Sequence, residues 1–228
     1  STPAQVLAWR DAIRGWGLPQ VGAGVAVHSL RAASPASIRA LAAACADDPA
    51  PIHVHVAEQT AEVDDCLAAT GLRPIDWLAT HLRLDPRWQL VHATHATPTE
   101  IERVGAAGAG VVICPSTEAN LGDGLCDLPG WLASGAALSV GTDSHVTRHW
   151  PGELQLLEYG QRLRQRRRNV AADPGPHAGS TTSTAARLFE RLGRGGAAAA
   201  GQPLWGLRPG ARADWLVTSS CALDIVRA

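Results

Sequence analysis

The sequence lacks a long apolar run, a pronounced net charge and an N-terminal signal. No apolar stretch approaches the roughly 20 residues that a membrane-spanning helix needs, and no basic segment followed by apolar residues resembles a signal peptide. The net charge of -1 gives no electrostatic reason to expect nucleic acid or a charged membrane as partner. We therefore expect a cytoplasmic protein that acts on a small molecule.

Paired cysteines are also missing. The five cysteines, at positions 45, 66, 114, 126 and 221, are odd in number and lack the close spacing of a zinc ribbon or a disulfide-stapled domain. They are expected to be reduced structural thiols. With 228 residues, 46% of them hydrophobic and 18% charged, the chain can bury the core of one large domain or two small ones.

Strand-like and helix-like stretches alternate along the chain at a steady interval, which predicts βαβ units and a parallel sheet. The expected strands cover 21–27, 51–56, 88–91, 111–114 and 136–140. Helices are expected at 34–45, 60–69, 73–81, from 97 to about 105, at 129–134 and at about 183–191. Five strands, each followed by a helix, favour an α/β fold that is part of a TIM-like (β/α)8 barrel.

Chemically capable side chains follow four of these apolar runs. His28, His55, His92 and Asp143 each lie at or just beyond a strand end, where barrel enzymes place their catalytic residues. Imidazole and carboxylate groups suit both a divalent metal and proton transfer. A lone histidine is more often structural, but four such positions favour a shared site. His53 is expected to face the opposite side of its strand and to pack against a helix.

Five longer strings are specific enough to compare with known families. They are HVHVAEQ (53–59), LVHATH (90–95), CPSTEANLGDG (114–124), GTDSH (141–145) and LEYGQRLRQRRRN (157–169). These strings resemble those of the formimidoylglutamate deiminases, a family of the amidohydrolase superfamily. The resemblance covers about residues 25–169, with a weaker superfamily-level similarity to the end.

This resemblance implies hydrolysis of N-formimidoyl-L-glutamate to N-formyl-L-glutamate and ammonia, a step of histidine degradation. It also implies one divalent metal, most often zinc, held by a His-x-His pair on strand 1 together with His55 and Asp143. Such a metal would lower the pKa of bound water from 15.7 to about 7. Asp143 could accept the proton of that water, His92 could orient it or act as base, and Glu58 could carry a proton to the substrate nitrogen.

Substrate contacts are expected from the segment after the first strand. Arg31 is placed to bind a substrate carboxylate bidentately, with His28 assisting. Residues 116–124 are expected to form a loop, in which Ser116, Thr117 and Glu118 either line the pocket or only shape the turn. Supporting contacts are expected from three further residues, His95, Ser144 and His145.

The chain departs from the family pattern at its start. By this resemblance the chain is expected to begin near strand 4, without strands 1–3 and their His-x-His pair. We expect a partial barrel over 1–192 and, over 193–228, a segment that returns to a small β-sandwich. The chain is expected to be a fragment of a larger, homodimeric enzyme, and to be inactive by itself; a short protein that pairs with another chain is the other explanation.

Two other functions fit parts of the pattern. A deaminase of guanine or a related heterocycle would share the His-x-x-Glu motif of His55 and Glu58, and would also share His92 and Asp143. Its substrate would have no carboxylate for Arg31. An interaction module would not hold stoichiometric zinc. The arginine-rich stretch 162–168 is expected to be a solvated helix face, or to pair with Glu153 and Glu158, and not to bind nucleic acid.

Overall fold

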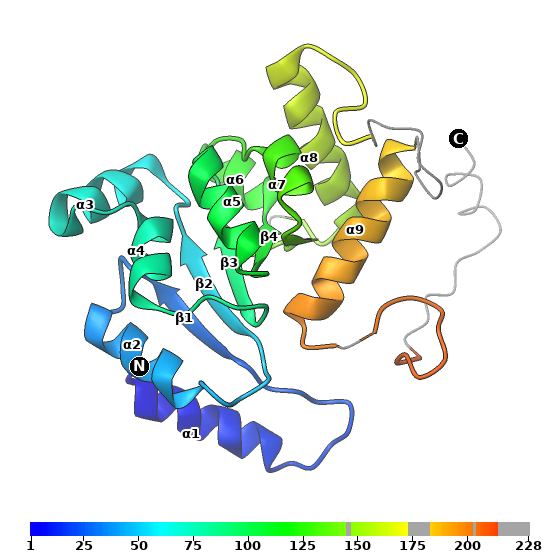
Figure 1. Ribbon diagram of the computed structural model, residues 1–228. Coiled ribbons are helices and arrows are strands. Elements are labelled where there is room, and N and C mark those ends of the chain that lie inside the picture. Colours follow the sequence, from blue (N-terminus) through cyan, green and yellow to red (C-terminus); the bar gives the residue numbers. More distant parts are fainter. Residues whose placement is uncertain (145–146, 173–182, 203, 214–228) are drawn as a thin grey trace.

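A parallel sheet of five strands forms the centre of the protein (Figure 1), in a computed structural model that describes residues 1–144, 147–172, 183–202 and 204–213. The strands are neighbours in chain order, as in part of a (β/α)8 barrel, and all pairs are parallel. The predicted fold class is confirmed. The strands are β1 (Val25–Ser29), β2 (Ile52–Val56), β3 (Trp88–His92), β4 (Gly110–Ile113) and β5 (Ala137–Val140).

Helices separate consecutive strands, and most begin with proline in their first turn, where its missing N–H costs nothing. None of the helices in the described ranges is long and apolar enough to cross a membrane. The helices are α1 (Pro3–Arg14), α2 (Pro35–Ala44), α3 (Thr60–Thr70), α4 (Pro74–His81), α5 (Pro98–Ala106), α6 (Pro115–Leu121), α7 (Leu128–Ser134), α8 (Trp150–Gln165) and α9 (Thr184–Ala199).

One face of the sheet carries the main core. Val54, Leu90, Val111 and Leu138 stand side by side in the strand register, and each is at most 1% exposed. Because side chains alternate along a strand, the other face receives the residues between them.

The histidines of β2 lie on that other face together. His53 and His55 are two residues apart, so they share a face, and the predicted opposite placement of His53 was wrong. The expected helix contact of His53 is confirmed, because its Nε2 lies 2.9 Å from the carbonyl oxygen of Ala199, at the end of α9.

Helix α9 packs against β5 and β4, and its Leu188 and Leu192 are nearly fully buried. Figure 1 shows α9 beside the sheet. It extends to Ala199, whereas the sequence predicted an end near 191, so the predicted division between 192 and 193 falls inside a helix. Residues 204–213 contain no strand, and the rest of the predicted β-sandwich segment lies outside the described residues.

The arginine-rich stretch starts within α8. The Nε of Arg162 donates to Glu158 at 2.8 Å, which confirms one of the predicted ion pairs. Among the described residues, Glu153 has no arginine partner of the expected kind; it accepts a hydrogen bond from the backbone N–H of Ser116 at 2.9 Å. The carboxylate thereby joins α8 to α6, beside the carboxyl ends of the strands.

Candidate active site

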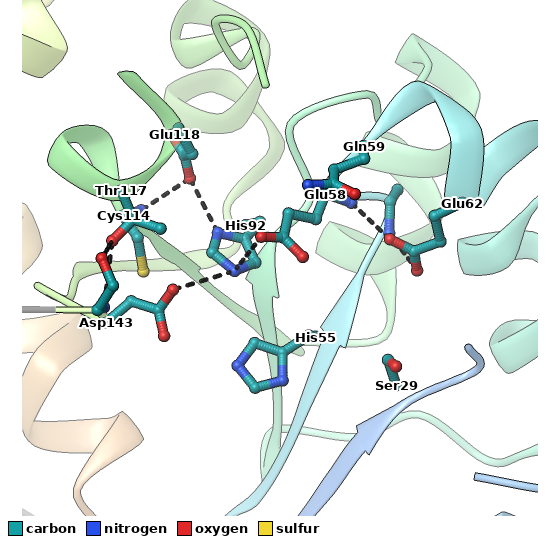
Figure 2. A network of polar contacts seen from close by, with 12 residues as sticks. Ser29, His55, Glu58, Gln59, Glu62, His92, Cys114, Thr117, Glu118 and Asp143 are labelled. Atoms are coloured by element: carbon teal, nitrogen blue, oxygen red, sulfur yellow. Dashed lines mark hydrogen bonds and ion pairs between the residues drawn. The ribbon is translucent and has the colours of Figure 1, made fainter. Parts of the chain in front are cut away.

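The carboxyl ends of β2, β3 and β5 bring together His55, Glu58, His92 and Asp143 (Figure 2). His92 lies at the centre and is 1% exposed. Its Nε2 is 3.6 Å from a Glu58 oxygen and 3.7 Å from an Asp143 oxygen. The ring of His55 is stacked 5.5 Å away, between centroids. The convergence predicted from strand ends is therefore present, with an imidazole held between two carboxylates.

The backbone at these strand ends is strained. Ala57, His92 and Asp143 have φ angles of 49°, 70° and 41°, in the left-handed region that non-glycine residues avoid. Each such residue costs on the order of 1–3 kcal/mol, and the conformation persists only because surrounding contacts impose it. Strain of this kind concentrates at functional sites, and here it falls on the residues that the sequence singled out or on their neighbours.

Buried side chains hold the strained segments in place. Glu62, in the first turn of α3, accepts hydrogen bonds from the backbone N–H groups of Ala57 at 3.1 Å and Glu58 at 2.9 Å. These contacts direct the Glu58 side chain toward His92. Sequence analysis did not identify Glu62, whose role depends on α3 folding back over the end of β2.

Thr117 performs a similar task for Asp143. Its hydroxyl lies 3.2 Å from the carbonyl oxygen of Thr142 and accepts from the backbone N–H of Ser144 at 3.2 Å, so it bridges both neighbours of Asp143. The Ser144 hydroxyl is 2.9 Å away. The predicted supporting contact of Ser144 is thus observed, whereas His145 lies outside the described residues.

Glu118 contacts the other side of the His92 ring. One of its oxygens is 3.3 Å from His92 Nδ1 and accepts from the backbone N–H of Cys114 at 2.8 Å. Burial alone would lower the pKa of His92, but the hydrogen bond to Glu118 and the charges of Glu58, Glu118 and Asp143 outweigh burial and raise that pKa above its usual value. Residues 116–118 were expected in a loop; they form part of α6.

His55 is oriented by the backbone of the preceding strand. Its Nδ1 lies 2.6 Å from the carbonyl oxygen of His28, a contact in which Nδ1–H must be the donor. The lone pair of Nε2 is then available to a metal ion. His28 itself is exposed, with its Nδ1 2.9 Å from the Ser29 hydroxyl and its ring centroid 5.3 Å from that of His55.

Arg31 lies beside the site, but it is engaged by carboxylates of this chain. Its guanidinium forms an ion pair with Glu58, and its Nε is 3.8 Å from Glu62. A further contact, at 3.4 Å, joins it to the side-chain oxygen of Gln59. With its side chain 32% exposed, the guanidinium remains accessible from outside, so its predicted contact with a substrate carboxylate stays a prediction.

The donor atoms suit zinc in kind but are too few. His55 offers a free ring nitrogen and Asp143 a carboxylate, and both are ordinary zinc ligands, whereas a catalytic zinc normally has three protein ligands. Within the ranges that the structure describes, no group of three or more His, Cys, Asp or Glu side chains is arranged to hold a metal ion. The two residues therefore fit part of a metal site.

A β/α-barrel segment whose strand ends present imidazoles and carboxylates to one another has the arrangement in which metal-dependent hydrolases of this architecture place their catalytic groups. The chain belongs to the amidohydrolase family, whose profile matches residues 6–220. It is 48% identical to formimidoylglutamate deiminase from Pseudomonas aeruginosa over 195 residues. The aligned region covers 85% of this chain and 42% of that protein.

Solved structures agree with this assignment. An amidohydrolase from Brucella melitensis superposes with a TM-score of 0.83 at 40% identity, over 93% of this chain and 45% of that one. An adenosine deaminase from Xanthomonas campestris with bound zinc gives a TM-score of 0.73 at 23% identity, over 87% of this chain and 43% of that one. The chain thus spans less than half the length of these proteins.

Proposed function

We propose that this chain forms part of an enzyme that hydrolyses N-formimidoyl-L-glutamate to N-formyl-L-glutamate and ammonia, with one divalent metal, zinc, in the site. The observation that carries the proposal is His92, buried between Glu58 and Asp143 and stacked on His55. Similarity to the Pseudomonas aeruginosa deiminase supports the choice of substrate. His55 and Asp143 would hold the metal, and the remaining ligands would come from outside the described residues.

In this proposal, the proton transfers of C=N hydrolysis are assigned to Asp143, His92 and Glu58. When bound, a divalent metal would supply Lewis acidity and lower the pKa of water. The water oxygen adds to the formimidoyl carbon, and its protons pass to Asp143 and His92, whose Nε2 faces Asp143. Glu58, which also lies near Nε2 of His92, receives these two protons in turn and delivers them to the substrate nitrogen, so that the =NH group becomes the leaving NH3. The C–N bond then breaks, ammonia leaves and the new carbonyl remains on N-formyl-L-glutamate.

Arg31 is proposed to recognise a glutamate carboxylate of the substrate. The guanidinium lies next to Glu58, so a carboxylate bound there would place the formimidoyl group close to the proton donor. His28, exposed at the same strand end, would assist. Homodimer formation in the complete enzyme is proposed too, and nucleic acid is not proposed as a partner.

The proposal is tested by ammonia release from N-formimidoyl-L-glutamate in the presence of zinc. The assay compares the chain alone with the chain joined to the part of the Pseudomonas aeruginosa relative that it does not cover. We expect turnover only in the joined protein. Release from guanine or adenosine, but not from formimidoylglutamate, would overturn the choice of substrate.

Arg31→Ala in the joined protein tests substrate recognition. Loss of one charge-assisted contact worth about 1.5–3 kcal/mol should raise KM roughly 10- to 100-fold. Arg103→Ala is the matched control, because Arg103 pairs with Asp76 at 2.7 Å between α5 and α4. An unchanged KM in Arg31→Ala would exclude the carboxylate contact.

A further inference from the structure

The contacts of His92 differ on the two sides of its ring. On the Nδ1 side, Glu118 lies within hydrogen-bond distance, at 3.3 Å. On the Nε2 side, Glu58 and Asp143 lie at 3.6 and 3.7 Å, beyond the reach of a good hydrogen bond. A neutral imidazole carries one proton, and the nitrogen with the better acceptor keeps it.

Glu118 is itself held rigidly. It belongs to α6 and is 3% exposed, and the oxygen that faces His92 also accepts from the backbone N–H of Cys114. Cys114 directly follows β4, the strand next to β3, which ends at His92. The carboxylate therefore keeps its position relative to the ring without help from a ligand (Figure 2).

We propose that Glu118 is a positioning residue that fixes the neutral His92 ring in the Nδ1–H tautomer and directs the lone pair of Nε2 at the space between Glu58 and Asp143. The proton on Nδ1 is donated to Glu118, and Nε2 is free to accept a proton. Without Glu118, the acceptors that the described residues place near the ring are Glu58 and Asp143 on the Nε2 side, so the proton moves there and Nε2 can no longer accept a proton.

The tautomer can be read directly from the 228-residue chain. Long-range ¹H–¹⁵N NMR at a pH where the ring is neutral distinguishes a protonated from a bare ring nitrogen, and His92→Asn assigns the signals. We expect Nδ1–H in the unmodified chain and a shift of the proton to Nε2 in Glu118→Ala. Glu118→Gln keeps an oxygen for the Cys114 N–H and for Nδ1–H but loses the charge, so it should give a mixture.

Glu100→Gln is the matched control. Glu100 is also a buried carboxylate in the first turn of a helix, α5, and it accepts from the backbone N–H of Thr97 at 2.8 Å, but none of its contacts among the described residues is with a histidine ring. It should leave the His92 tautomer unchanged. An Nε2–H signal in the unmodified chain, or Nδ1–H retained in both Glu118 variants, would overturn the proposal. If Glu118→Ala does not fold, Glu118→Gln decides alone.

The catalytic consequence rests on the proposed function. In the joined protein with zinc, Glu118→Gln should lower kcat about 10- to 100-fold, the range seen for supporting partners of site histidines, while KM changes less than about twofold. A purely structural Glu118 would reduce the amount of folded protein and leave kcat per folded molecule unchanged. If the joined protein has no deiminase activity at all, the proposed function fails, while the NMR result still decides the tautomer.

Discussion

Replacing Gly195 with alanine would drive a methyl group into the backbone of β5. A Cβ at this position of α9 would lie 1.7 Å from the carbonyl oxygen of Leu138, half of the 3.4 Å at which ordinary contact begins. The atoms nearest to that Cβ are backbone atoms of Leu138, so no side chain can rotate away. The helix itself must move by more than an ångström, which also withdraws Leu188 and Leu192 from the core.

The magnitude follows from opposing contributions to the free energy of unfolding. Alanine stabilises a helix interior by up to about 1 kcal/mol relative to glycine. Overpacking costs about 1–3 kcal/mol, and partial exposure of two leucines, each worth about 1.5–3 kcal/mol when fully buried, costs roughly 1–2 kcal/mol more. We expect a net destabilisation of about 1–4 kcal/mol, measured by urea unfolding.

The adjacent Gly196 provides the control. It belongs to the same helix, but a Cβ there meets nothing within 4 Å. Gly196→Ala should therefore stabilise the protein by about 0.5–1 kcal/mol through helix propensity alone. Equal unfolding free energies for the two variants would refute the close packing of α9 on β5.

Three further predictions concern the support of Asp143, the ion pair of Asp48 and the burial of Cys114. Thr117→Val removes the hydroxyl that bridges both neighbours of Asp143, so zinc affinity of the joined protein, measured by chelator competition, should fall about 10- to 100-fold; Thr117→Ser should retain it, and equal affinities would contradict the bridging role. The hydrogen bond from Arg14, at 2.8 Å, holds the pKa of Asp48 below its usual range. Because the folded-state pKa is depressed, the stabilisation is present above about pH 4 and is lost as the pH falls through the depressed pKa. The loss of unfolding free energy in Asp48→Asn, measured with urea, should therefore shrink at low pH. A loss that does not change with pH would count against this ion pair. Burial raises the pKa of the Cys114 thiol, so iodoacetamide near pH 8 should modify this residue only after unfolding, as followed by mass spectrometry; rapid labelling of the folded chain would disprove its burial.

Most elements could be predicted from local sequence because their signals are local. The β2 segment, Ile52–Val56, is a short β-branched run, and Thr97-Pro98 marks the start of α5 with a capping residue and a proline. The face of the sheet on which a strand residue lies can also be predicted locally, because residues two positions apart share a face. The prediction for His53 was wrong because it placed His53 and His55, two positions apart, on opposite faces.

Helices α6 and α9 show where local signals are insufficient. Gly122 lies in the left-handed conformation just after α6, and the glycines around it made residues 116–124 read as a loop. In α9, Gly193, Gly195 and Gly196 lower helix propensity, yet the helix continues to Ala199 because its surface packs on β5. Burial outweighed intrinsic preference in that case.

The sequence by itself determined the parallel α/β organisation and the strand ends that carry His55, His92 and Asp143. The apolar runs mark the strands, and the polar residue at or after the end of each run marks the position of the site. Only the tertiary structure decided that Glu118 meets Nδ1 of His92, that Thr117 bridges the neighbours of Asp143, and that Arg31 pairs with Glu58. These contacts join residues 25–27 positions apart. No periodic pattern encodes them, because they arise only when helices fold back over the ends of neighbouring strands.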